Sequence, residues 1–132
     1  MVVRCVKTSI DTDNSNVINS DMREYLKIGN EYIVYGIRTS NESSYFMIFD
    51  DGHLVEVPSS MFEVIEGKVS PLWVVWDDGL NNITLWPELF YKDDFFENFS
   101  EWEDRERKEF EKLKQYFEEC KEPRNSRAFF VR

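Results

Sequence analysis

The feature that most constrains the fold of this chain is a change of hydrophobic period between residues 92 and 100. Residues 1–92 contain short runs of β-branched and aromatic residues separated by turn formers, a pattern typical of strands. From about residue 100 to residue 121 the apolar residues recur every three or four positions, as on one face of a helix. Strands followed by one long amphipathic helix predict an α+β fold, and 132 residues suit a single domain.

The strand-rich part predicts about six or seven short antiparallel strands. Asp50–Gly52 and Asp77–Gly79 are typical of hairpin turns, because Asp and Gly tolerate positive φ. Residues 32–37 and 45–49 are expected to pair as a further hairpin. Runs such as 45–49 are apolar at both alternating sets of positions, which indicates strands that are covered on both faces. We therefore predict a small antiparallel β-sheet or SH3-like barrel with the helix packed against it.

The predicted helix, about residues 100–121, has a focused apolar face. Ser100 and Glu103 have the spacing of a capping box, so the helix is expected to begin at Ser100. At about 100° per residue, an arc roughly 80° wide holds Phe99, Trp102, Phe110, Leu113, Phe117 and Cys120. Glu106 lies inside this arc, where an apolar residue is expected. Glu106 is therefore predicted either to pair with a cation or to mark a part of the helix that overhangs the core.

The two ends of the chain lead to further expectations. Pro123 ends the helix, and the short apolar run that follows predicts a final edge strand at about 127–131. Cys5 and Cys120 lie far apart in the sequence, which favours two free thiols in a reducing cytosol, with a single disulfide between them as the alternative. The N-terminus becomes polar too early for a signal peptide, so a cytoplasmic location is expected.

The charge of the chain indicates which partners it attracts. Its 26 Asp and Glu residues outnumber 16 Lys and Arg residues, giving a formal net charge of -10. The 11 Phe, 6 Tyr and 4 Trp residues are too many for a disordered acidic tail, so the charge belongs to a folded body. Such a body repels nucleic acid and anionic membranes and attracts a basic protein.

Part of this negative charge is expected to form ion pairs within the helix. Three pairs have the favourable i, i+4 order of an acid before a base, namely Glu101 with Arg105, Glu103 with Arg107, and Asp104 with Lys108. The acids without nearby bases are more available to a partner. Asp50 and Asp51 are interpreted as turn residues only.

Acids mixed with aromatic residues are typical of protein interfaces, and this mixture occurs from residue 76 to residue 97. The alternative is that these aromatic residues belong to the core, and the sequence gives the two interpretations equal weight. The candidate partner-binding residues are Trp76, Asp77, Asp78, Trp86, Glu88, Tyr91, Asp93, Asp94 and Glu97.

The sequence gives no pattern for catalysis. Its one histidine, His53, follows a turn, and the five glycines form no phosphate-binding or dinucleotide-binding motif. The two cysteines have no metal-ligand spacing. We therefore expect neither an enzyme nor a protein with a cofactor or a metal ion.

The segment Leu26–Ile37, the two Asp-Asp-Gly hairpins and the acidic C-terminal helix resemble small bacterial immunity proteins, which protect against polymorphic or contact-dependent growth-inhibition toxins. The stretch Gly29–Ile37 also resembles the opening strand of SH3-like barrels. The resemblance implies a non-catalytic inhibitor that binds a basic toxin domain, expected to be a nuclease, and it assigns no site residues. The alternative is an acidic regulatory or nucleic-acid-mimicking module that binds another basic protein.

Overall fold

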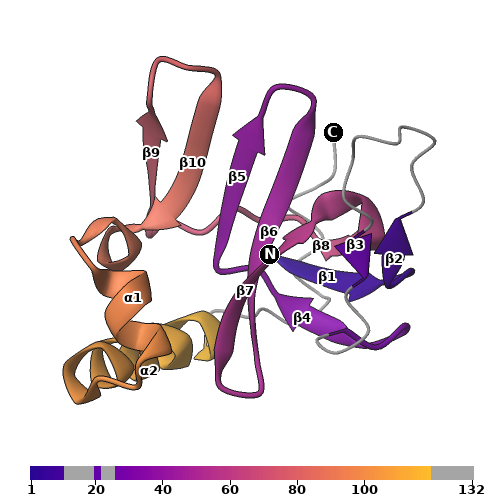
Figure 1. Ribbon diagram of the computed structural model, residues 1–132. Helices are drawn as coiled ribbons and strands as arrows, with labels where there is room; N and C mark the ends of the chain where they lie inside the picture. Colours follow the sequence, from indigo (N-terminus) through magenta and orange to yellow (C-terminus); the bar gives the residue numbers. More distant parts are fainter. Residues whose placement is uncertain (11–19, 22–25, 120–132) are drawn as a thin grey trace.

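The computed structural model describes residues 1–10, 20–21 and 26–119 (Figure 1). It confirms the predicted antiparallel α+β fold, and its main strands form two open sheets rather than an SH3-like barrel. The three-stranded sheet has the order β4 (Glu31–Ile33), β1 (Val2–Cys5), β8 (Phe62–Glu66). The five-stranded sheet has the order β7 (His53–Pro58), β6 (Ser43–Asp50), β5 (Gly36–Ser40), β10 (Asn82–Pro87), β9 (Trp73–Asp77).

The remaining elements are short, apart from one helix. A small ladder joins β2 (Ser9–Ile10) to β3 (Ser20–Asp21). Two 3-10 helices, η1 (Ser59–Met61) and η2 (Glu88–Tyr91), follow β7 and β10. The helical part consists of α1 (Phe95–Ser100) and α2 (Asp104–Glu119). No helix in the described ranges is long and apolar enough to span a membrane. The strand predicted at 127–131 and the residue Cys120 lie outside the described residues.

The predicted strand at 32–37 is divided between the two sheets. Its first part is β4 and its second part is β5. Between them, the Val34 amide donates to the Met1 carbonyl at 3.0 Å and the Tyr35 amide donates to the Met47 carbonyl at 2.8 Å. Both residues are buried. The prediction of one continuous strand was wrong, because the chain passes from one sheet to the other at Val34 and Tyr35. The backbone amides of these two residues are hydrogen-bonded to different parts of the chain, which allows the change.

The five-stranded sheet has a separate core on each of its faces, because side chains alternate along a strand. On β6, Phe46 and Ile48 pack on one face with residues of the three-stranded sheet. Met47 and Phe49 pack on the other face with residues of α1 and α2. The five-stranded sheet therefore lies between the three-stranded sheet and the helices (Figure 1), as the apolar run 45–49 predicts.

The hairpin turns confirm the predicted turn chemistry. Asp51 and Gly52 both have positive φ, 48° and 82°, between β6 and β7. Gly79 has a φ of 78° between β9 and β10. Asn41, with a φ of 51°, lies in the two-residue connection from β5 to β6.

The helical part is broken in two, which corrects the predicted start at Ser100. Ser100 is the last residue of α1, and its hydroxyl donates to the Glu97 carbonyl at 2.7 Å instead of capping a new helix. Trp102 then adopts a φ of 62°, which stops the first helix. The Arg107 amide donates to the Glu103 carbonyl at 3.0 Å, the first hydrogen bond of α2. The prediction that Trp102 lies on the apolar stripe of the helix was therefore wrong: Trp102 precedes α2 and is 61% exposed.

This break changes the expected ion pairs. Asp104 and Lys108 form theirs at 3.4 Å. Glu101 and Glu103 precede α2, so Arg105 instead pairs with Glu109 at 3.2 Å. Arg107 donates to main-chain carbonyls, among them that of Gly52 at 2.7 Å.

Glu106 also departs from expectation. The side chain is half-buried, and it accepts from the Asn98 amide Nδ2 at 3.2 Å. Asn98 belongs to α1, which folds back beside the start of α2. The partner found in the described part of the chain is thus a neutral amide from the preceding helix, a contact that a single continuous helix could not form.

Gly36 is required where β5 passes under an indole ring. A Cβ at this position would lie 2.5 Å from Cδ1 of Trp86 and 3.2 Å from the Leu85 carbonyl oxygen. We expect Gly36→Ala to lower the free energy of unfolding by about 1 to 3 kcal/mol, because the ring or the strand must move. Urea denaturation measures this loss. Gly67→Ala is the control, because its Cβ would meet only Val64 Cγ1 at 3.5 Å. Equal stability of the two variants would contradict the steric argument.

Candidate protein-binding site

Strand β9 lies at the edge of the five-stranded sheet and is exposed on both faces (Figure 1). Val74 and Trp76 point to one face and are 47% and 61% exposed, while Val75 points to the other and is 62% exposed. The general prediction that the apolar runs are covered on both faces is therefore wrong for this strand. The two cores lie under β5, β6 and β7 and end before they reach the far part of β9.

An open groove lies beside β9, with a volume of about 370 Å³. Its lining residues are Val74, Trp76, Glu88 and Tyr91. The sequence-predicted residues Trp76, Glu88 and Tyr91 thus come together. Val74 is a lining residue that the sequence did not indicate, because a valine in an apolar run is equally consistent with a covered strand.

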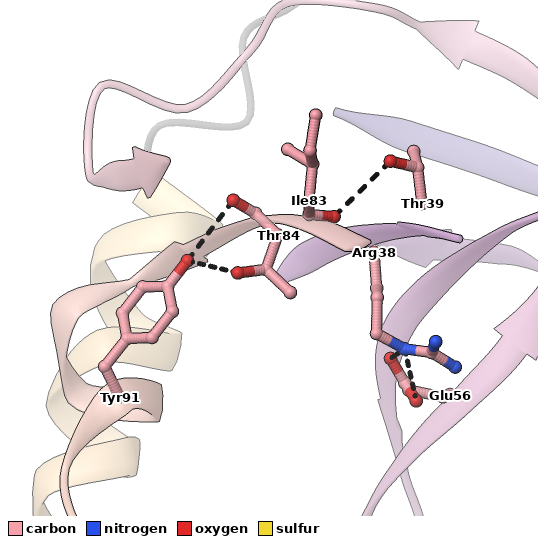
Figure 2. A network of polar contacts seen from close by, with 6 residues as sticks. All are labelled: Arg38, Thr39, Glu56, Ile83, Thr84 and Tyr91. Carbon is pink, nitrogen blue, oxygen red and sulfur yellow. Dashed lines mark hydrogen bonds and ion pairs between the residues drawn. The ribbon is translucent and has the colours of Figure 1, made fainter. Parts of the chain in front are cut away.

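Tyr91 is one of the residues that line this groove, and its hydroxyl lies beside both the side-chain and the carbonyl oxygen of Thr84 (Figure 2). Its hydroxyl donates to the Val74 carbonyl at 2.7 Å and also lies 2.7 Å from Thr84 Oγ1. Because the Tyr91 hydroxyl donates its one proton to the Val74 carbonyl, the Thr84 hydroxyl is the donor of its hydrogen bond with Tyr91. These bonds tie η2 to both strands of the β9–β10 hairpin. The groove is therefore held in shape before any partner binds.

Glu88 is the charged group of the groove. Its side chain is exposed, and no cation in the described part of the chain pairs with it. A larger groove of about 630 Å³ continues from Glu88 and Tyr91 toward α2, where Leu113 is among its lining residues. The acid on that side, Glu109, is paired with two cations, and the hydrogen bonds from Lys92 and then Arg105 stabilise its carboxylate and hold its pKa below the ordinary value.

Asp77 and Asp78 lie at the other end of β9 and build its turn. Asp77 Oδ1 accepts from the Gly79 amide at 2.9 Å, and Asp78 Oδ1 accepts from the Leu80 amide at 2.7 Å. The Leu80 bond, followed by that from the Asn82 side chain, lowers the pKa of Asp78. Both carboxylates are exposed. They therefore combine turn chemistry with negative charge at the tip of the hairpin.

Trp86 lies within the folded body and not in the groove. Its ring packs between Tyr91 and Phe96, with centroid distances of 5.2 and 5.4 Å. Asp93, Asp94 and Glu97 are exposed at the start of α1, beyond η2, and they do not line the groove. For Trp86 the structure thus favours the core interpretation.

A polar pair that the sequence did not indicate lies on the same sheet face, starting two strands inward from β9. Arg38 of β5 is opposite Thr84, and its Nε donates to both carboxylate oxygens of Glu56, at 2.9 and 3.2 Å (Figure 2). The guanidinium also lies 4.4 Å from the centre of the Tyr45 ring. The bond with Glu56 raises the pKa of Arg38. The pair is neutral overall, so it does not offset the negative charge of Glu88 in the groove.

Within the described ranges, no group of three or more His, Cys, Asp and Glu side chains is placed to hold a metal ion. Cys5 is buried, and its thiol donates to the Lys7 carbonyl at 3.3 Å. In comparisons with known proteins, the chain matches no protein-family model, no curated protein and no solved structure.

Proposed function

We propose that this chain is a non-catalytic acidic binding protein, an immunity protein that neutralises a basic toxin domain by direct binding. The observation that carries the proposal is the preformed groove in which an exposed tryptophan, Trp76, lies beside the carboxylate of Glu88. The toxin domain is expected to be a nuclease, because a nuclease presents a basic surface to its substrate.

The groove suits a lysine or arginine side chain of the partner. Val74, Trp76 and Tyr91 offer apolar and aromatic walls for the alkyl stem. Glu88 offers a charge-assisted hydrogen bond to the cationic head, and the indole face of Trp76 adds a cation–π contact. The net charge of -10 increases the rate of encounter with a basic partner.

Co-expression tests the proposed function. The toxin domain is taken from the reading frame immediately upstream of this gene, which should encode a long secreted protein with a variable C-terminal domain. We expect this chain to rescue cells from that domain and not from unrelated basic nucleases. Inhibition of several unrelated nucleic-acid-binding proteins would favour a nucleic-acid mimic. Failure to rescue from the upstream domain would contradict the proposal.

Association kinetics give a second prediction. The association rate constant with the toxin domain should fall roughly tenfold or more between about 0.05 M and about 0.5 M NaCl, because salt screens the attraction between the two surfaces. The dissociation rate should change much less, because the groove contacts are short-ranged. Surface plasmon resonance measures both rates. An association rate constant that does not change with NaCl concentration would contradict the electrostatic part of the proposal.

A further inference from the structure

We infer that the partner binds by strand addition: an extended basic segment pairs with the free edge of β9 as a sixth strand of the large sheet. This inference rests on the proposed function and specifies how the site works. It depends on the outward backbone groups of β9, on the apolar side chains along this edge, and on the charge of the β9–β10 hairpin.

The backbone of β9 has unused hydrogen-bonding groups along its outer side. The Asp78 amide donates to the Asn82 carbonyl at 3.1 Å. In an antiparallel pair the residues that bond the neighbouring strand alternate with residues that do not. Val74 and Trp76 therefore bond to β10, and the amides and carbonyls of Val75 and Asp77 point away from it. No other described strand lies on that side of β9.

Among the described edge strands of the two sheets, β7, β4 and β8 carry protective features, whereas β9 carries one charge, Asp77, at its end beside the hairpin turn. Pro58 ends β7, and β4 is only three residues long. β8 bears Glu63 and Glu66 and is joined to β1 with a register shift. By contrast, β9 pairs with β10 over five residues without a shift, and its sequence from Trp73 to Trp76 is wholly apolar. An exposed apolar edge of this kind is a template for an added strand.

The charge of this region selects a basic partner. From Val69 to Tyr91 the sequence contains three acids, Asp77, Asp78 and Glu88, and no Lys, Arg or His. Two acids lie at the tip of the hairpin and the third lies in the groove. A second copy of the chain would bring two such hairpins together, so like charges would oppose pairing. A basic segment gains both main-chain bonds and charge complementarity.

The added strand should alternate in its contacts. Side chains on one face would lie against the groove of Val74, Trp76, Glu88 and Tyr91, and side chains on the other would lie against Val75. A long basic residue is expected on the groove side, with a residue of any apolar type opposite Val75. The main chain then supplies affinity and the groove supplies specificity.

Amide hydrogen exchange tests the inference on the unmodified chain with an inactivated form of the upstream toxin domain. The amides of Val75 and Asp77 should exchange rapidly in the free chain and at least roughly tenfold more slowly in the complex. The amides of Val74 and Trp76 serve as internal controls, because they already bond to β10. A complex without protection at Val75 and Asp77 would overturn the inference and leave the proposed function standing. Protection of these amides in the free chain would also overturn it, since the edge would already be occupied.

A backbone variant gives an independent measurement. Val75→Pro removes one outward amide donor without breaking a bond to β10, and proline is tolerated at such edge positions. We expect the Kd for the toxin domain to rise about tenfold. Val75→Thr is the matched control, because it keeps the amide and the β-branched shape, and its Kd should stay within about threefold. Equal Kd values for the two variants would overturn strand addition, and if Val75→Pro does not fold, the exchange experiment decides. If the toxin domain does not bind the unmodified chain at all, the proposed function fails and strand addition fails with it.

Discussion

We expect Arg107→Ala to lower the free energy of unfolding by about 2 to 3 kcal/mol. Arg107 Nη1 donates to the Gly52 carbonyl at 2.7 Å, and its Nε donates to the Phe99 carbonyl at 3.0 Å. Its guanidinium lies between the rings of Phe99 and Trp102, 3.6 Å from each centroid. One side chain thus joins α2 to the end of α1 and to the turn between β6 and β7. Alanine removes all these contacts and leaves the Gly52 carbonyl without this donor.

The matched control is Arg105→Ala on the same helix. The Arg105 side chain is 80% exposed and pairs with Glu109 at 3.2 Å, so its loss should cost about 0.5 kcal/mol or less. Arg107→Lys should recover little stability, because an ammonium group cannot reproduce the planar fork between two rings. Urea denaturation followed by circular dichroism measures all three variants. Equal losses for Arg105→Ala and Arg107→Ala would show that Arg107 does not join the elements.

The role of Arg107 could not be predicted from its sequence neighbours. The i, i+4 spacing predicts a pair with Glu103, but Trp102 has a positive φ and Glu103 precedes the helix. The true acceptors, the carbonyls of Gly52 and Phe99, belong to elements that meet α2 only in the tertiary fold. Local spacing indicates which contacts a continuous helix would allow, and it carries no information on where a helix is broken.

More of the sheet structure than of the helical structure could be predicted from the sequence. Asp-Gly turns and alternation of apolar residues are local signals, and they correctly predict the β6–β7 and β9–β10 hairpins. The change of sheet at Val34 and Tyr35 could not be predicted, because two consecutive buried apolar residues are equally consistent with a continuous strand. The acceptors of their amides, Met1 and Met47, are supplied by distant parts of the sequence.

The candidate site was predictable in composition but not in shape. The mixture of acids and aromatic residues predicts candidate residues between positions 76 and 97, and three of them, Trp76, Glu88 and Tyr91, line one groove. The same mixture includes Trp86, which packs within the fold. Whether an apolar strand residue is covered depends on where the opposing layer ends. Val74 and Trp86 face each other across β9 and β10, yet only one lines the groove.

Trp76→Ala should raise the Kd for the toxin domain about 100-fold, which corresponds to about 2.7 kcal/mol. Trp76 is 61% exposed in the free chain and lines the groove beside Glu88. Burial of its indole against a partner would supply a large apolar area and a cation–π surface. Because most of the Trp76 side chain is exposed in the free chain, Trp76→Ala should change the free energy of unfolding by about 0.5 kcal/mol or less. Surface plasmon resonance and urea denaturation measure the two quantities.

Trp102 provides the sharpest control for Trp76, because it is also 61% exposed and carries the same side chain. Its ring contacts Arg107 at 3.6 Å and covers Gly52, where an added Cβ would lie 2.8 Å from Cη2 of the indole. Trp102→Ala should therefore lower the free energy of unfolding by about 1 to 2 kcal/mol and leave the Kd within about threefold. The opposite pattern is expected for Trp76→Ala. If both variants weakened binding equally, exposed aromatic area in general would drive association, and the groove beside β9 would not be the binding site.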